Sequence, residues 1–229
     1  MDRRRAIGWM LVLALGLAGC ARQGTDTGAG KMKFLALGDS YTIGEGVAAA
    51  DRWPVQLAAL LREQGQDFAE PQIIARTGWT TDELSDAIDA ADPRGPYDLV
   101  SLLIGVNNQY RGRGTEEYRA EFAGLLQRAI GFAGGDASRV IVLSIPDWGA
   151  TPFAEGRSRA NIAAEIDVFN AINRQETERL GARYVDITPQ SRTAGSNPAF
   201  LAPDGLHYSG LTYAEWARLA LPAALEAVQ

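Results

Sequence analysis

The sequence predicts an α/β domain built on a mostly parallel sheet. From residue 33 to the end of the chain, short apolar runs alternate with longer segments whose apolar side chains recur at helical spacing. The apolar runs are continuous, as expected for strands buried on both faces. At 229 residues the chain is long enough for one such domain and short for two. We therefore expect a single sheet with helices covering each side.

Five segments are predicted to be strands. The apolar run at 97–104 is the strongest and ends at Gly105, and Pro146 stops the run at 139–145. The five segments in order are 33–37, 72–75, 97–104, 139–145 and 182–187.

Five helices fall between and after these strands. Thr80 and Glu83 have the spacing of a capping box, so a helix is expected to open there. Gly181 is expected to end the long fourth helix, and Pro222 to kink the last. The expected helices are 52–63, the segment from residue 80, 115–132, 158–180 and 211–228.

The N-terminus has the order of a bacterial secretion signal. Three arginines precede an apolar stretch over 6–17, which is too short to span a membrane. The ending Leu17-Ala18-Gly19-Cys20 resembles the lipobox of bacterial lipoproteins, which implies cleavage before Cys20 and lipids on that residue. The alternative is an ordinary signal peptide followed by an incidental cysteine. Ala21 after the cysteine favours, by the same resemblance, an outer-membrane location facing the periplasm.

The domain boundaries follow from this interpretation. Residues 1–19 are expected to be a signal peptide, 20–32 a lipidated cysteine with a flexible glycine-rich tether, and 33–229 the folded domain. Cys20 is the only cysteine, so a disulfide within the chain is impossible. Without residues 1–19 the chain keeps 19 basic and 27 acidic side chains, so lipid rather than charge is expected to hold it at the membrane.

Composition also excludes several classes of function. A net charge of -6 without a basic stripe argues against nucleic-acid binding. One histidine and one cysteine leave only carboxylates for a metal, and no glycine-rich phosphate loop is present. We expect neither a cofactor nor a metal.

Four residues placed after the predicted strands suggest serine chemistry. Ser40 follows the first strand, Gly78 the second and Asn107 the third, while His207 lies beyond the fifth. The carboxyl ends of parallel strands meet at one edge, where α/β sheets bind ligands. A serine hydroxyl needs a base to become a nucleophile, and His207 is the only histidine available. Taken alone, Gly38-Asp39-Ser40 is equally typical of an ordinary turn, with Asp39 ordering that turn.

Four blocks together resemble the SGNH (GDSL-type) hydrolase family. They are Gly38-Asp39-Ser40-Tyr41, Gly78, Gly105-Val106-Asn107 and Asp204-x-x-His207, in the family's order from about residue 33 to 215. The resemblance implies a flavodoxin-like three-layer α/β/α sandwich with a mostly parallel five-stranded sheet. It also implies hydrolysis of esters or thioesters.

The resemblance assigns a role to each block. Ser40 would be the nucleophile, His207 the base, and Asp204 the group that orients the imidazole, although a backbone carbonyl could do so instead. The Ser40 and Gly78 amides and the Asn107 side chain would form the oxyanion hole. Gly78 also fits a plain turn before a helix. Asn108 stands where many members have aspartate, which leaves the network behind Asn107 open.

Possible pocket residues are less well defined. Trp79 and Trp148 are the candidates, with core packing as the alternative for each. Tyr41, Tyr110 and Phe153 also follow strand ends. A polar loop expected at 109–114, with Arg111 and Arg113, could reach over the site or be simply solvated.

The sequence therefore predicts a serine esterase of the cell envelope that acts on small-molecule, glycan or lipid esters with short acyl groups. A lysophospholipase or thioesterase is the alternative within the hydrolases, and an acyltransferase would share the same residues. From other classes, a non-catalytic lipoprotein that binds envelope glycan and a structural lipoprotein linking envelope partners remain open.

Overall fold

The fold is a three-layer α/β/α sandwich. The computed structural model describes residues 30–229, so the predicted signal peptide and Cys20 lie outside the described residues. The sheet has the strand order β2-β1-β3-β4-β5, and every neighbouring pair is parallel. The strands are β1 (Phe34–Gly38), β2 (Gln72–Ala75), β3 (Leu99–Leu103), β4 (Val140–Leu143) and β5 (Arg183–Val185).

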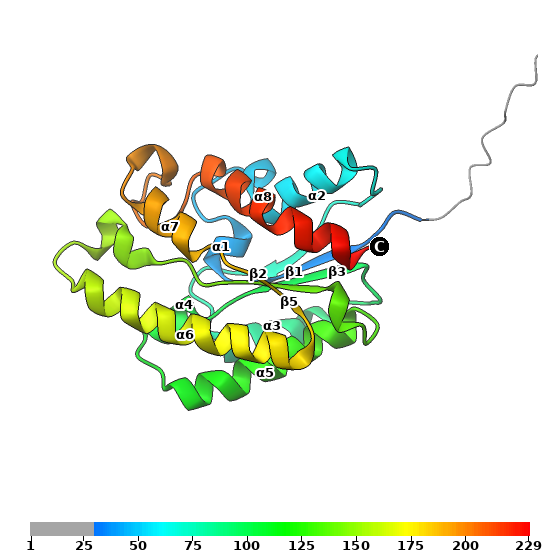
Figure 1. Cartoon of the computed structure of the whole chain (residues 1–229), viewed down its shortest axis with the longest axis horizontal. Coiled ribbons are helices and arrows are strands. Elements are labelled where there is room, and N and C mark those ends of the chain that lie inside the picture. The colour runs from blue at the N-terminus through cyan, green and yellow to red at the C-terminus, as the bar shows by residue number, and fades with distance from the viewer. Residues whose placement is uncertain (1–29) are drawn as a thin grey trace, which may run out of the picture. The chain divides into compact units, whose positions relative to one another are not determined.

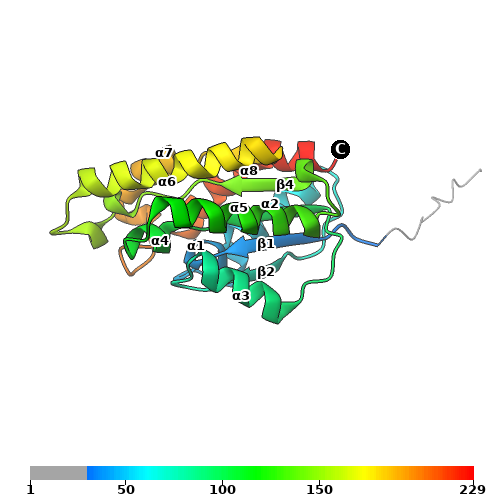
Figure 2. The ribbon, with the colours of Figure 1, turned by 90° about the horizontal axis from the view of Figure 1, so that it is seen from below.

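Helices cover both faces of this sheet (Figure 1). One layer contains α2 (Trp53–Glu63), packed against α8 (Gly210–Ala227). The other contains α3 (Thr81–Ala91), α5 (Thr115–Phe132) and α6 (Arg159–Leu180), which lie side by side beneath the sheet (Figure 2). The predicted fold class is confirmed.

The core explains why the strands are continuously apolar. Every residue of β1, β3 and β4 is buried, because each strand is covered from both sides. β1 and β2 have the predicted lengths, whereas β3, β4 and β5 are each shorter than the predicted runs, since hydrogen bonding ends before the apolar sequence does. The extra apolar residues, such as Ile104 and Ile145, are buried all the same.

The predicted helix ends agree with the structure. Thr80 and Glu83 form the expected capping box at the start of α3. Gly181 ends α6 in the left-handed conformation with a φ of 80°. α8 continues through Pro222 as a single helix.

Three helices were not predicted. They are α1 (Ser40–Ile43), α4 (Val106–Tyr110) and α7 (Thr188–Gly195). The polar loop expected at 109–114 therefore begins only at Arg111, because Gln109 and Tyr110 belong to α4. α7 has weak helical propensity and is held by tertiary contacts, among them the ion pairs of Arg192 with Asp147 and Asp167 at 2.8 and 2.7 Å.

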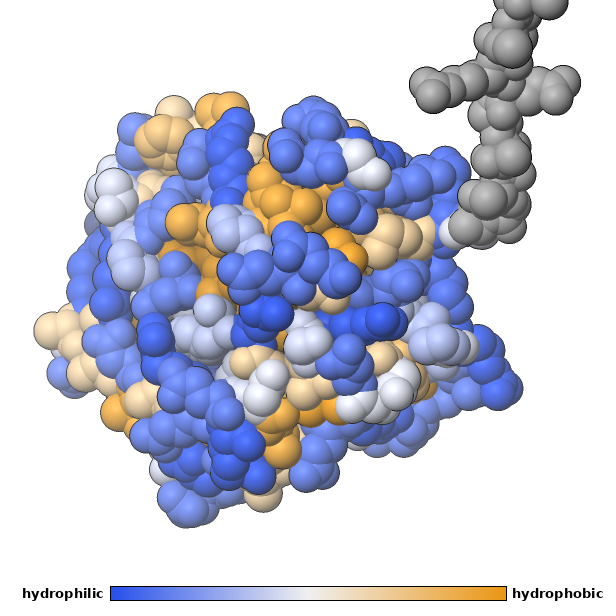
Figure 3. Space-filling view, turned by 45° about the vertical axis from the view of Figure 1, so that its right-hand side comes forward, coloured by the Kyte–Doolittle hydropathy of each residue, from blue (hydrophilic) through white to orange (hydrophobic). Residues whose placement is uncertain are grey.

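Most of the molecular face seen in Figure 3 is hydrophilic, with apolar side chains gathered in its upper part. Two leucines of α8, Leu211 and Leu219, are among the exposed large apolar residues. Within residues 30–229, no helix combines the length and apolarity that crossing a membrane requires.

Candidate active site

The carboxyl ends of β1, β2 and β3 share a small pocket. Strand order reverses between β1 and β3, so this edge is the switch point at which ligands bind to open α/β sheets. The pocket has a volume of about 170 Å³ and is lined by residues that follow all three strands. Ser40, Gly78, Asn107 and His207, which lie far apart in the sequence, all line it.

Ser40 is held on a tight turn between β1 and α1. Asp39 caps α1, and its side chain accepts a hydrogen bond from the Tyr41 amide at 3.1 Å. Gly38 permits the turn, because a Cβ there would overlap the Thr42 side chain and lie 2.5 Å from the Leu103 carbonyl oxygen. The Ser40 side chain thus lies at the first residue of a helix, with its neighbours fixed, and is 5% exposed at the pocket.

His207 is oriented by Asp204. The His207 Nδ1 lies 2.6 Å from one carboxylate oxygen of Asp204. The other oxygen accepts hydrogen bonds from the amides of Leu206 and His207, each at 2.9 Å. Partial burial works to raise the pKa of Asp204, but the hydrogen bonds from His207 and the two amides prevail and lower that pKa below its usual value. An ionised Asp204 requires Nδ1 to donate, which leaves the Nε2 lone pair free to accept a proton.

Three hydrogen-bond donors converge on the same pocket. Among the described residues, the amides of Ser40 and Gly78 have no recorded protein acceptor. Gly78 adopts a φ of +88°, a conformation that glycine reaches without strain. The Asn107 amide nitrogen donates one hydrogen to the Trp79 carbonyl at 2.9 Å, and its second hydrogen remains available.

The residues after Asn107 anchor it from behind. Asn108 is fully buried and bonds to Thr81, accepting from its amide at 3.1 Å and donating to its hydroxyl at 2.6 Å. Gln109 accepts from the Trp148 indole at 2.8 Å and donates to Glu165 at 2.7 Å. Asn108 therefore fills the position of the family's usual aspartate as part of a satisfied network, and α4 is fixed between α3 and α6.

Comparison with known families identifies the chain. The GDSL-like Lipase/Acylhydrolase family matches residues 36–215, which includes every residue of this site. The chain belongs to this family. A search of curated proteins found no match.

Solved structures share the fold of this GDSL-like hydrolase. TesA is 18% identical, with 84% of this chain and 97% of that chain covered and a TM-score of 0.65. The acetylxylan esterase Axe2 from Geobacillus stearothermophilus is 20% identical, with coverage of 84% and 94% and a TM-score of 0.65. The psychrotrophic esterase EstA from Pseudoalteromonas sp. is 15% identical, with coverage of 83% and 95% and a TM-score of 0.63. At these identities the likeness concerns the fold alone.

Aromatic side chains form one wall of the pocket in this GDSL-like hydrolase. Trp148, Tyr110 and Phe153 all line it, and their ring centroids lie 5.3 to 6.4 Å apart. Tyr41 lines it as well and packs edge-on against His207 at 5.6 Å. Trp79 is not among the lining residues, because its side chain packs against the core and only its carbonyl meets Asn107.

Arg111 stabilises the segment around Gly78, which lines the pocket after β2. Its guanidinium donates to the Gly78 carbonyl at 2.6 Å and forms an ion pair with Glu83 at 3.2 Å. Arg111 of the predicted loop thus contacts the pocket residue Gly78 but does not itself line the pocket. Arg113 instead pairs with Asp82 at 3.1 Å.

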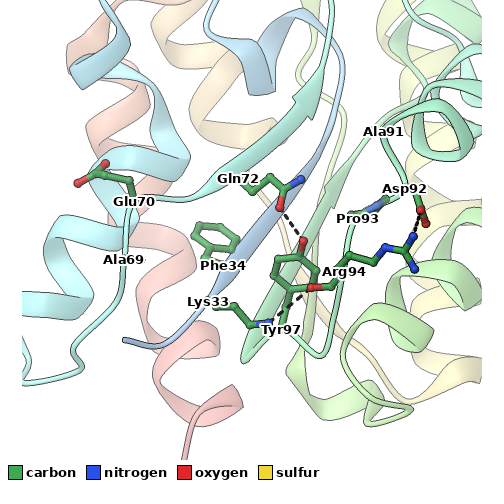
Figure 4. A pocket seen from close by; sticks show the side chains of 10 residues that line it. All are labelled: Lys33, Phe34, Ala69, Glu70, Gln72, Ala91, Asp92, Pro93, Arg94 and Tyr97. Atoms are coloured by element: carbon green, nitrogen blue, oxygen red, sulfur yellow. Dashed lines mark hydrogen bonds and ion pairs between the residues drawn. The ribbon is translucent and has the colours of Figure 1, made fainter. Parts of the chain in front are cut away.

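A larger hollow of about 430 Å³ opens at the other edge of the sheet, where β1 and β2 begin (Figure 4). Several of its polar groups are bonded to one another: Tyr97 donates to Gln72 at 2.6 Å, and Lys33 to the Arg94 carbonyl at 3.5 Å. It contains neither serine nor histidine. The smaller pocket is therefore the candidate active site. In residues 30–229, no three His, Cys, Asp or Glu side chains gather as metal ligands would.

Proposed function

We propose that this GDSL-like hydrolase is a serine esterase that cleaves carboxylic esters through an acyl-Ser40 intermediate. The observation that carries the proposal is the bond of 2.6 Å between His207 and Asp204 in the pocket that also contains Ser40. It brings an oriented imidazole, a hydroxyl and three groups with available N–H hydrogens to one small space.

The reaction follows from these groups. The Ser40 oxygen attacks the ester carbonyl carbon while His207 Nε2 takes the hydroxyl proton. The Ser40 and Gly78 amides and the Asn107 side chain donate to the oxygen that becomes negative. The carbon–oxygen bond to the alcohol then breaks, and the alcohol leaves with the proton held by His207. Water repeats the sequence on the acyl-serine, which releases the acid and restores Ser40.

The size of the pocket favours short acyl groups such as acetyl. Its volume of about 170 Å³ is below the ~300–1,000 Å³ typical of pockets for drug-sized ligands. Trp148 forms part of the wall and is held rigid by Gln109, so the pocket does not widen through rotation of that ring.

A chain-length series of p-nitrophenyl esters tests this proposal. We expect the purified full chain to hydrolyse acetyl and butyryl esters faster than octanoyl esters, with Ser40→Ala and His207→Ala near background. Ser196→Ala is the matched control, because its hydroxyl bonds only to the Thr193 carbonyl at 3.1 Å on the surface. A serine-directed phosphonate should label the parent and not Ser40→Ala.

The other outcomes discriminate between the alternatives. Faster turnover of long esters, or of a lysophospholipid or acyl thioester, would replace the short-acyl proposal. Transfer of the acyl group to an added alcohol in preference to water would indicate an acyltransferase. Equal activity in all variants, with no phosphonate labelling, would refute the hydrolase proposal. A glycan-binding or structural lipoprotein would then be the remaining interpretation.

We also propose that the enzyme is anchored in the bacterial envelope by lipids on Cys20. The sequence Leu17-Ala18-Gly19-Cys20 supports this. The chain enters the fold at Met32, whose amide bonds to the Asp67 carbonyl at 2.9 Å, at the edge of the sheet opposite the pocket. Labelled palmitate should enter the parent and not Cys20→Ser; equal labelling of both would refute the anchor.

A further inference from the structure

One arginine beside the pocket has an unusual environment. Arg157 follows the short 3₁₀ turn Pro152–Ala154 and precedes α6. Its guanidinium carbon lies 5.1 Å from the ring centre of Tyr110, 5.3 Å from that of Trp148 and 5.9 Å from that of Phe153. It also donates to the Tyr110 hydroxyl at 3.2 Å. The cation therefore lies against the aromatic wall of the catalytic pocket.

The charge of Arg157 is not compensated by the protein. Within residues 30–229, no carboxylate lies at ion-pairing distance from it, and its side chain is exposed. Arg111, which bonds to the pocket residue Gly78, is paired with Glu83. In a chain of net charge -6, a cation beside the active site without a carboxylate partner stands out.

Two carboxylates near the catalytic residues lie on other sides of the pocket. Glu45 accepts a hydrogen bond from Thr77, which lines the pocket on the β2 side. Asp204 is engaged by His207. A negatively charged substrate group is therefore repelled from these positions and attracted to the guanidinium of Arg157.

We propose that Arg157 selects ester substrates that carry an anionic group, a carboxylate or a phosphate, near the scissile bond. The inference rests on the proposed esterase function. The ester group would occupy the pocket, and the rest of the substrate would extend across Tyr110 and Phe153, both of which are partly exposed, to the guanidinium. Its planar fork binds carboxylate or phosphate through paired hydrogen bonds, and the rings shield one side from water.

A purely structural role predicts something different. If Arg157 only covers the rings, its loss disturbs the wall and slows neutral and anionic esters by the same factor. The discriminating quantity is therefore the ratio of kcat/KM for an anionic ester to that for its neutral counterpart. Comparing this ratio between variants cancels the intrinsic reactivity of each substrate.

The experiment uses three acetyl esters and the purified full chain. The substrates are 4-acetoxybenzoate, its neutral methyl ester, and 4-acetoxyphenyl phosphate, which separates carboxylate from phosphate preference. We expect Arg157→Gln to lower the anionic-to-neutral ratio about fivefold, as an exposed ion pair of about 1 kcal/mol provides, chiefly through KM. Arg157→Lys should retain part of the ratio. Arg94→Gln, which removes the same charge at the other edge of the sheet, should leave it unchanged.

Salt provides an independent readout. The anionic-to-neutral ratio of the parent should decrease as the salt concentration rises from 0.02 to 0.5 M, while the same ratio for Arg157→Gln stays constant. Salt has this effect because it screens exposed charges, with a Debye length of ~10 Å at 0.1 M. An unchanged ratio in Arg157→Gln, or equal slowing of both esters, would overturn the inference while leaving the esterase proposal intact. Failure of the parent to hydrolyse even the neutral ester would overturn both.

Discussion

Asp39, the residue before the candidate nucleophile, is a fully buried carboxyl with one unpaired oxygen. One oxygen accepts from the Tyr41 amide, and the other has no partner among the described residues. Burial raises the pKa of Asp39 from 3.8 to about 7, against the lowering effect of backbone hydrogen bonds from Tyr41 and from Asp39 itself. The perturbation we consider is Asp39→Asn, which keeps the shape and the acceptor for Tyr41 but removes the titration.

The sign and size of the effect follow from linkage. Between pH 3.8 and about 7 the folded protein retains a proton that the unfolded chain has lost. The contribution of Asp39 to stability is therefore fully present below pH 3.8 and is lost as the pH rises to 7. A shift of about three units corresponds to on the order of 4 kcal/mol. The advantage of Asp39→Asn over the parent should grow by that amount between pH 4 and pH 8.

Urea unfolding of both proteins across this pH range measures the difference. Carboxyls that titrate identically in both proteins, such as Asp204, contribute equally to the two free energies of unfolding and cancel in their difference. Asp136→Asn is the matched control: Asp136 also accepts from the amide two residues later, at 3.0 Å, but is exposed and has a lowered pKa. Its contribution to stability is already present above pH 3.8 and is lost only at lower pH, so its difference from the parent should stay nearly constant between pH 4 and pH 8. Parallel stability curves for parent and Asp39→Asn, within about 1 kcal/mol, would refute the raised pKa.

Three further predictions concern the site. Asp204→Asn should lower kcat by ~10²–10⁴ with little change in KM, because the His207 tautomer is no longer fixed; retained kcat would exclude Asp204 as the orienting group. Asn107→Ala should lower kcat by ~10²–10³, measured on a short ester, whereas a change in KM alone would contradict its oxyanion role. Asn108→Ala should lower the free energy of unfolding by about 2–3 kcal/mol in urea, because Thr81 loses both bonds; an unchanged midpoint would contradict this.

The fold was predictable because its dominant signal is local. Strands buried on both faces are continuous apolar runs, and capping residues such as Thr80 and Gly181 mark helix ends in the sequence itself. α7 carries no comparable signal. Its helical state depends on Arg192 reaching Asp147 and Asp167, which are 45 and 25 residues away in the chain.

The site was only partly predictable, because only part of its signal is local in the sequence. Ser40, Gly78, Asn107 and His207 each follow a strand or lie in a recognisable block, and the parallel sheet brings their segments to one edge. The pocket wall depends on the fold. Nothing near Trp79 or Trp148 in the sequence tells which ring lines the pocket, and no local pattern places Arg157 over three rings.

The position of the oxyanion donor depends on residues that do not act on the ester. Asn107, Asn108 and Gln109 are consecutive in α4, so their side chains leave the helix about 100° apart and point in three directions. They meet the pocket, Thr81 at the start of α3, and Trp148 with Glu165 of α6. A helix of five residues is too short to be stable alone, so these buried bonds fix its place. Oxyanion stabilisation needs donors that are already in position, and here Asn108 and Gln109 provide that rigidity from behind Asn107.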